Sequence, residues 1–187
     1  MTDRSDAITT LLQDWSGGDL EAAEEVLPKI YDRLRHIAAS YFIHERLDHT
    51  LQPTAVVHEV LMRWQQRPTL IRDRGHFYAL VARLMRQVLV DHARKHRRLK
   101  RGGDVEKVPL SALTALDPKT YDGMLALDHA LSELRVDEPR QAAVVEMRFF
   151  GGLTHEDIAE SLQVSKRTVI REWQRARTRL KARLASA

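Results

Sequence analysis

Apolar side chains recur every three or four residues along most of the chain, which is the spacing of one helix face. No segment alternates apolar and polar residues convincingly, as a half-buried strand would, so the pattern predicts an all-α protein. Asp19 follows Gly17 and Gly18 and is placed to cap a helix. Pro28 lies inside that helix and is expected to kink it or to move its boundary. The predicted helices cover residues 7–16, 19–44, 53–66, 76–98, 124–135, 139–150, 154–162 and 166–184.

The helical periodicity is interrupted over residues 101–122, which contain two glycines and two prolines. A connection this long is unusual inside one compact domain, so we interpret it as a flexible linker. The predicted organisation is therefore an N-terminal helical domain over residues 1–100, the linker over 101–122, and a C-terminal domain over 123–187.

Two helices near the C-terminus have the spacing of a helix-turn-helix. Thr154 can cap the first of them, and Asp157 can reach back to the capping amide. The short turn Gln163-Val164 then leads to Ser165, which is placed to cap the last helix.

The last helix has an apolar row and a basic surface. Val169, Trp173, Ala176 and Leu180 recur at helical spacing and are expected to be buried. The N-terminal end of such a helix can enter the major groove of DNA, where side chains reach base edges and phosphates. The alternative is a helical hairpin with a solvated basic face. The candidate DNA-binding residues are Ser165, Lys166, Arg167, Thr168, Arg171 and Arg175.

Charge is distributed unevenly, although the formal net charge is only +4. Residues 1–32 hold eight acidic and two basic residues, whereas residues 83–101 and residues 164–187 each hold eight basic residues and one acidic residue. Two separate basic zones indicate a polyanion that is bound at two places.

Three segments resemble the extracytoplasmic-function (ECF) group of bacterial RNA polymerase sigma factors. "LTHEDIAESLQVSKRTVIREWQRARTRLK" is similar to the promoter-reading C-terminal domain, although Gln163 stands where glycine is common. "TAVVHEVLMRW" resembles the polymerase-binding helix, and "FYALVARLMRQVLVDHARKHRR" resembles the helix that handles the upstream promoter element. The resemblance implies that the chain binds core RNA polymerase and promoter DNA. The C-terminal domain would read the minus-thirty-five element as duplex, and the N-terminal domain would melt the minus-ten element and hold its non-template strand.

Holding an unpaired strand requires a cationic surface and stacking side chains. Phe77 and Tyr78 supply two aromatic rings; the alternative is that both rings are simply core residues, which is the interpretation we adopt for Phe77. The candidate DNA-binding residues of this domain are Arg72, Arg74, His76, Arg83, Arg86, Arg94, Arg97 and Arg98.

The polymerase-binding helix departs from the family pattern at its start. The family commonly has acidic residues where this chain has Gln52, Pro53, Thr54 and Ala55. A phosphate on Thr54 would restore negative charge in the first helical turn, where the helix dipole favours an anion. We therefore hypothesise control by a Ser/Thr kinase through Thr54, with Thr50 as second choice. Two alternatives remain: the regulator could be an anti-sigma factor, which is more common in the family, and Thr54 could simply pack against its neighbours or cap the helix. The candidate polymerase-binding residues are Thr54, Val57, His58, Glu59, Leu61 and Arg63. Val57, Val60, Leu61 and Trp64 also recur at helical spacing, which is typical of core residues.

Other chemistry is not indicated. The chain has no cysteine, no phosphate-binding P-loop and no apolar stretch of roughly 20 residues, so we expect a cytoplasmic protein without cofactor or membrane insertion. His92 and His96 could chelate a metal, which leaves a metal-dependent nuclease as a weak alternative to a non-enzymatic function. A second alternative is a stand-alone helix-turn-helix regulator.

Overall fold

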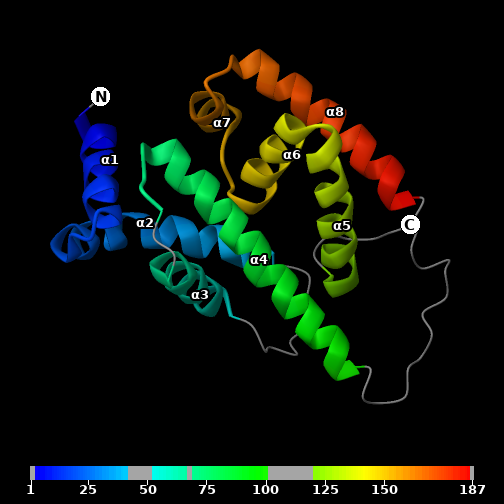
Figure 1. The fold of residues 1–187 in the computed structure, drawn as a ribbon, viewed down its shortest axis with the longest axis horizontal. Helices are drawn as coiled ribbons and strands as arrows, with labels where there is room; N and C mark the ends of the chain where they lie inside the picture. Colours follow the sequence, from blue (N-terminus) through cyan, green and yellow to red (C-terminus); the bar gives the residue numbers. More distant parts are fainter. Residues whose placement is uncertain (1–2, 42–51, 67–68, 101–119, 186–187) are drawn as a thin grey trace.

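The computed structural model describes residues 3–41, 52–66, 69–100 and 120–185, which form helices and contain no strand (Figure 1). The predicted all-α class is therefore confirmed for this part of the chain. The elements are α1 (Asp3–Ser16), α2 (Leu20–Ala39), α3 (Pro53–Gln66), α4 (Arg74–Lys100), α5 (Tyr121–Asp137), α6 (Pro139–Val145), the π-helix η2 (Glu146–Phe150), α7 (His155–Leu162) and α8 (Lys166–Ala185).

The start of α2 follows directly from its capping residue. The Asp19 carboxylate accepts hydrogen bonds from the backbone N–H groups of Glu21 and Ala22, at 2.9 and 3.2 Å. These bonds satisfy amides that have no partner within the helix. Pro28 lies inside α2 without ending it, and the helix ends at Ala39, before the predicted residue 44.

Aromatic rings hold α1, α3 and the start of α4 together. Trp15 and Trp64 meet edge to face with ring centroids 4.2 Å apart, and Trp64 also contacts Phe77 at 5.6 Å. The Ser16 hydroxyl accepts a hydrogen bond from the backbone N–H of Ile71, at 2.9 Å. The segment that precedes α4 is thereby fixed against α1.

The C-terminal half begins earlier than predicted. Thr120 caps α5 by accepting a hydrogen bond from the N–H of Gly123, so residues 121 and 122 belong to the helix rather than to the linker. The predicted helix over residues 139–150 is present as α6 followed by η2, in which the Gly151 amide donates to the Glu146 carbonyl at 3.2 Å. Residues 101–119 lie outside the described part of the chain.

The two halves pack against each other. Helix α4 contacts α5, η2 and α7, and the buried apolar residues form one cluster that spans both halves (Figure 1). The Tyr41 ring packs on Phe149 and Phe150, and a Cβ added at Gly75 would lie only 2.9 Å from the Cβ of Ser161. The division into two domains stays a prediction, because the described residues share this core.

Candidate nucleic-acid interface

Helix α7 begins with the predicted capping box. The Thr154 hydroxyl accepts from the Asp157 amide at 3.1 Å, and the Asp157 carboxylate accepts from the Thr154 amide at 3.0 Å. Arg33 of α2 donates to the same carboxylate at 3.2 Å. Burial opposes ionisation of Asp157, but these hydrogen bonds and the positive charge of Arg33 outweigh it and lower the pKa of the carboxyl.

The turn between α7 and α8 has the expected geometry. Gln163 adopts a left-handed conformation with φ of 53°, which glycine would accept at a lower energetic cost. The following Val164 packs on the apolar core, and its amide donates to the Ala159 carbonyl at 2.9 Å. Ser165 then caps α8 by accepting from the Thr168 amide at 3.1 Å. The helix-turn-helix predicted from the sequence is thus formed.

Burial along α8 differs from the prediction at one position. Val169, Ala176 and Leu180 are buried, but Trp173 is only half-buried and Glu172 is buried beside it. Position 172 is three residues after 169 and four before 176, so it lies on the same helix face as the apolar row.

The cations of α8 differ in their surroundings. Lys166, Arg167, Arg171 and Arg175 are exposed near its N-terminal end, where Lys166 pairs with Glu156 of α7 and Arg171 lies 3.4 Å from Glu172. Thr168 is half-buried and its hydroxyl contacts that of Ser165 at 2.9 Å.

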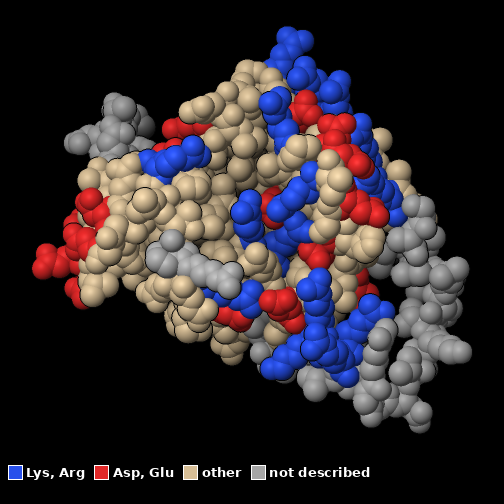
Figure 2. Space-filling view, in the orientation of Figure 1, with Lys and Arg blue, Asp and Glu red and all other residues tan. Residues whose placement is uncertain are grey.

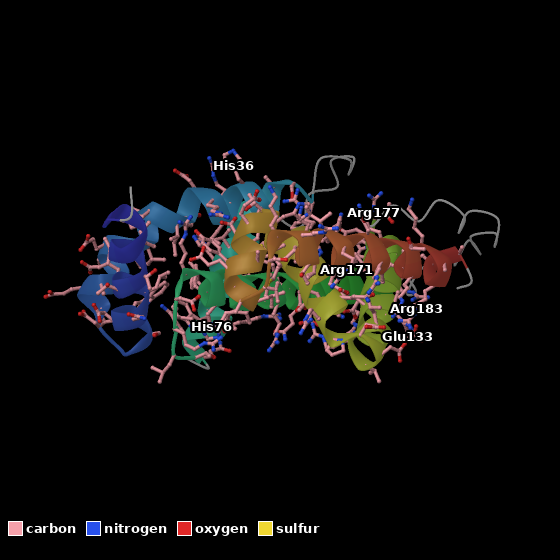
Figure 3. All side chains as sticks on the ribbon, turned by 90° about the horizontal axis from the view of Figure 1, so that it is seen from above. His36, His76, Glu133, Arg171, Arg177 and Arg183 are labelled. Atoms are coloured by element: carbon pink, nitrogen blue, oxygen red, sulfur yellow. The ribbon has the colours of Figure 1, made fainter. Side chains whose placement is uncertain are left out.

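Other α8 cations fasten the helix to α5. Arg183 pairs with Asp137 and with Glu133, which lies close to it (Figure 3). Arg179 pairs with Glu138, the residue between α5 and α6, at 2.6 Å. The basic charge counted in the sequence is therefore divided: Arg179 and Arg183 pair with acidic groups, whereas the N-terminal group and also Arg177 and Lys181 are exposed at the surface.

A second group of candidate residues lies at the start of α4. Asp73 caps this helix by accepting from the His76 amide at 2.7 Å, and the Arg72 amide donates to His76 Nδ1 at 3.2 Å. Burial and the nearby charge of Arg72 lower the pKa of His76. Arg74 lies over the Tyr78 ring, 5.7 Å from its centroid. These side chains are brought together as predicted, although their contact with DNA stays a prediction.

The burial of three α4 side chains decides between the interpretations of the sequence. Phe77 and Tyr78 are 0% and 4% exposed, so the core interpretation holds for both rings and neither offers a face for base stacking in this arrangement. Arg86 is 7% exposed and hydrogen-bonds to acceptors of α5 and η2, so it is not available to a phosphate here. Arg83, Arg97 and Arg98 are exposed, and Arg94 is exposed but pairs with Asp91 and Asp128.

Helix α3 presents only part of the predicted polymerase-binding set. Val57 is 0% exposed and cannot contact a partner, because it lies on the apolar face with Val56 and Val60. His58 is exposed, with Nε2 3.4 Å from the Tyr31 hydroxyl. Thr54 and Leu61 are half-buried.

Arg63 contacts both its own helix and α4. Arg63 pairs with Glu59 at 2.5 Å and with Asp91 of α4 at 3.0 Å. Thr50 lies outside the described residues.

The surface view agrees with the uneven charge of the sequence. Lys and Arg side chains gather along α8 and towards the C-terminal end of α4, while acidic side chains gather at the end formed by α1 and the start of α2 (Figure 2).

His96, one of the two histidines considered as metal ligands, stacks on Tyr121, with ring centroids 4.0 Å apart. Within the described ranges, no group of three or more metal-binding side chains is present, and no helix is both long and apolar enough to span a bilayer.

Comparison with known proteins agrees with the arrangement of these helices. A family model described as ECF sigma factor matches residues 5–186, which is almost the whole chain. No curated protein and no solved structure shows a significant match. A match of this extent, over a chain that folds into the helix-turn-helix and the basic helices described above, establishes that this protein belongs to the ECF sigma factor family.

Proposed function

We propose that this sigma factor contacts core RNA polymerase through the exposed face of α3, the minus-ten element through α4 and the minus-thirty-five element through the N-terminal end of α8. As a family member, the chain is an alternative sigma factor that directs transcription initiation and binds core RNA polymerase and promoter DNA. The assignment of each task to a helix is the proposal.

The observation that carries this proposal is the cationic N-terminal end of α8. Its exposed basic side chains project from a capped helix-turn-helix, which is the geometry that enters a major groove. Arg167 and Arg171 lie one helical turn apart, so both can approach the same groove.

Transcription in vitro tests the proposal. The purified chain, core RNA polymerase and a library of promoter sequences are expected to give transcripts with defined start sites. The Arg171→Ala variant is expected to lower transcript yield by about 5- to 150-fold, since one good base-reading or phosphate-binding arginine contributes about 1–3 kcal/mol. Arg183→Ala is the matched control, because Arg183 is occupied by Asp137 and Glu133.

Two results would contradict the assignment. Equal yields from the Arg171→Ala and Arg183→Ala variants would remove α8 as the reading helix. A specific complex between the chain and one DNA sequence, unchanged by core polymerase, would instead support a stand-alone regulator.

We also propose that a Ser/Thr kinase controls polymerase binding through Thr54. The first turn of α3 holds no acidic residue, and Thr54 directly follows Pro53, the first helical residue. Amides of a first helical turn have no carbonyl partner within the helix, so a phosphate at this position would meet free donors and the positive end of the dipole.

Binding of core polymerase to Thr54 variants tests the kinase proposal. Thr54→Glu is expected to bind at least about tenfold more tightly than Thr54→Ala, which corresponds to about 1.4 kcal/mol for one new charge contact. Gln66→Glu adds the same charge at the opposite end of α3 and should have no such effect. Equal affinity of the two Thr54 variants, together with no gain when the native chain is phosphorylated, would exclude the switch and favour an anti-sigma factor.

A further inference from the structure

Glu172 is a buried acidic residue on the apolar face of α8. It is 7% exposed, and its neighbours on that face, Val169 and Ala176, are both 0% exposed. Burying a carboxylate is unfavourable unless hydrogen bonds and opposite charges replace the water that it loses. An apolar side chain would suit this position better for packing alone, so the acidic group calls for another explanation.

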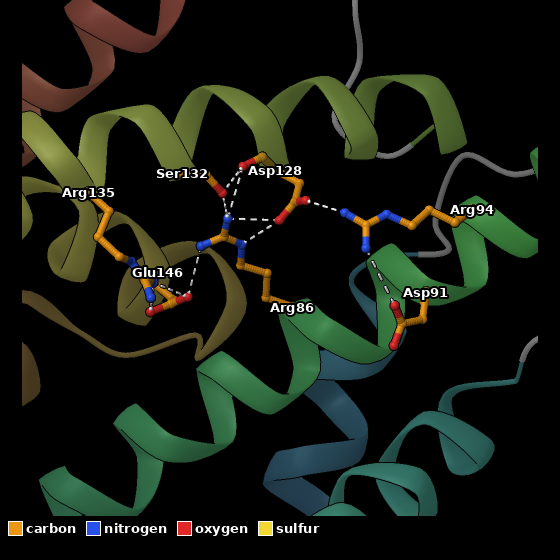
Figure 4. Close-up of polar contacts among 7 residues, drawn as sticks. All are labelled: Arg86, Asp91, Arg94, Asp128, Ser132, Arg135 and Glu146. Atoms are coloured by element: carbon orange, nitrogen blue, oxygen red, sulfur yellow. Dashed lines mark hydrogen bonds and ion pairs between the residues drawn. The ribbon is translucent and has the colours of Figure 1, made fainter.

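A second buried acidic residue shows how a structural carboxylate is held in this protein. Glu146 of η2 is 6% exposed and accepts hydrogen bonds from Arg135 at 2.7 Å and from Arg86 at 3.2 Å (Figure 4). These donors belong to α5 and α4, so the Glu146 carboxylate connects three elements. Among the described residues, the cations paired with Glu172 instead lie on its own helix. Its contacts therefore do not connect α8 to the rest of the fold.

The Glu172 carboxylate contacts two exposed cations near the N-terminal end of α8. Its Oε1 accepts a hydrogen bond from Arg171 Nε at 3.4 Å, and the same oxygen lies 3.9 Å from Arg175 Nη1. Arg171 and Arg175 are one helical turn apart, so their like charges repel each other. A carboxylate shared between them offsets this repulsion and holds both guanidinium groups near one point of the helix.

The contact with Glu172 leaves the outer donors of Arg171 free. Glu172 accepts from Nε, whereas the two Nη groups form the end of the fork that can donate to O6 and N7 of a guanine. The Arg171 side chain is 57% exposed, so this end can enter a groove while Nε is held from the protein side. A long side chain that is ordered before binding loses less conformational entropy when it binds.

We propose that Glu172 is a positioning residue that orients Arg171 to read a guanine in the minus-thirty-five element. Glu172 acts from the buried face of α8 and does not itself touch the DNA. The inference deepens the proposed function and rests on it, because it requires that the N-terminal end of α8 reads the duplex.

Loss of the carboxylate has two effects of opposite sign. The N-terminal end of α8 becomes more positive, so its general attraction to phosphates is unchanged or stronger. Arg171 is no longer held, so its discrimination between guanine and the other bases becomes weaker. The preference for guanine therefore falls, whereas a purely structural defect would weaken binding to every sequence alike.

Transcription from a promoter library that varies each base pair of the minus-thirty-five element tests the proposal. With core polymerase, the native chain is expected to prefer guanine at one position, and Arg171→Ala is expected to lose that preference. Glu172→Met should lower the preference at the same position by about three- to tenfold, because one long side chain is no longer ordered beforehand. Glu172→Gln keeps an acceptor without the charge and should give an intermediate loss.

Glu138→Met is the matched control for the transcription experiment. It makes the same replacement and frees Arg179, which lies outside the group of cations at the N-terminal end of α8. The guanine preference of this variant should equal that of the native chain.

Two further measurements separate positioning from folding. Glu172→Met should leave the free energy of unfolding unchanged or raise it, because an apolar side chain suits the buried face; urea denaturation measures this. In a chain that already carries Arg171→Ala, Glu172→Met should cause no further loss of guanine preference, because its effect passes through Arg171.

Each contrary result removes a different claim. A native guanine preference in Glu172→Met, or the same loss with and without Arg171, would overturn the positioning role and leave the proposed function intact. A loss of yield that was equal for all sequences and came with lower stability would make Glu172 a structural residue. An equal loss for all sequences in Arg171→Ala would make Arg171 a phosphate contact and overturn guanine reading. If Arg171→Ala matched the native chain in yield and preference, the proposed role of α8 would fail as well.

Discussion

Replacing Phe77 with alanine is expected to lower the free energy of unfolding by about 3–5 kcal/mol. Phe77 is fully buried and contacts the rings of Trp64 and Tyr78, with centroids 5.6 and 5.2 Å away. Truncation removes these aromatic contacts and leaves a cavity that neighbouring helices can only partly fill. Urea denaturation followed by far-ultraviolet circular dichroism would measure the loss.

The exposed Arg83, on the same helix, provides the control for this prediction. Arg83→Ala should change the free energy of unfolding by less than about 0.5 kcal/mol, as expected for an exposed side chain. Suppose instead that Phe77→Ala changed the free energy of unfolding as little as Arg83→Ala does and weakened binding to single-stranded DNA. Phe77 would then be a base-stacking residue, which its sequence context also allowed.

Binding of the full chain to duplex DNA is expected to weaken by about 150-fold when monovalent salt rises from about 50 to about 200 mM. The exposed cations at the start of α8 are Lys166, Arg167, Arg171 and Arg175. If all of them contact phosphates, released counterions give a slope of about −3.6 in a plot of log affinity against log salt. Fluorescence anisotropy of a labelled duplex, titrated at several salt concentrations, would give this slope.

Single substitutions show which cations contribute to the slope. Arg171→Ala should make it shallower by about 0.9, because one fewer phosphate is neutralised. Arg183→Ala should leave it unchanged, since this side chain is held by acidic groups of α5. A slope that responded equally to both changes would mean that the C-terminal end of α8 also contacts DNA.

Features that depend on neighbouring residues in the chain could be predicted from the sequence. The capping box of Thr154 and Asp157 spans only three residues, so spacing and side-chain chemistry were sufficient to place the start of α7. Asp19 and Ser165 were likewise identified as helix caps from their positions in the sequence. The observed bounds of α3, Pro53–Gln66, match the prediction. The left-handed conformation of Gln163 agrees with the family resemblance, in which glycine is common at this position.

Features that depend on distant residues were missed or misplaced. Arg86 contacts groups 42 and 60 residues away in the sequence, and nothing local identifies Asp128 or Glu146 as its partners. One signal was present: Arg86 follows Ala82 by four residues and precedes Leu89 by three, and both are buried. Helical spacing therefore places Arg86 on the apolar face of α4, as the same spacing had already indicated a core position for Val57.

The tryptophans of this chain are divided between its two halves. Trp15 and Trp64 meet edge to face in the N-terminal core, whereas Trp173 is half-buried on α8. With Trp173 replaced by phenylalanine, the tryptophan emission would report on the N-terminal half alone. With Trp15 and Trp64 replaced instead, the emission of Trp173 would report on the helix-turn-helix. Intrinsic fluorescence can therefore follow the melting of each half separately, without any attached dye.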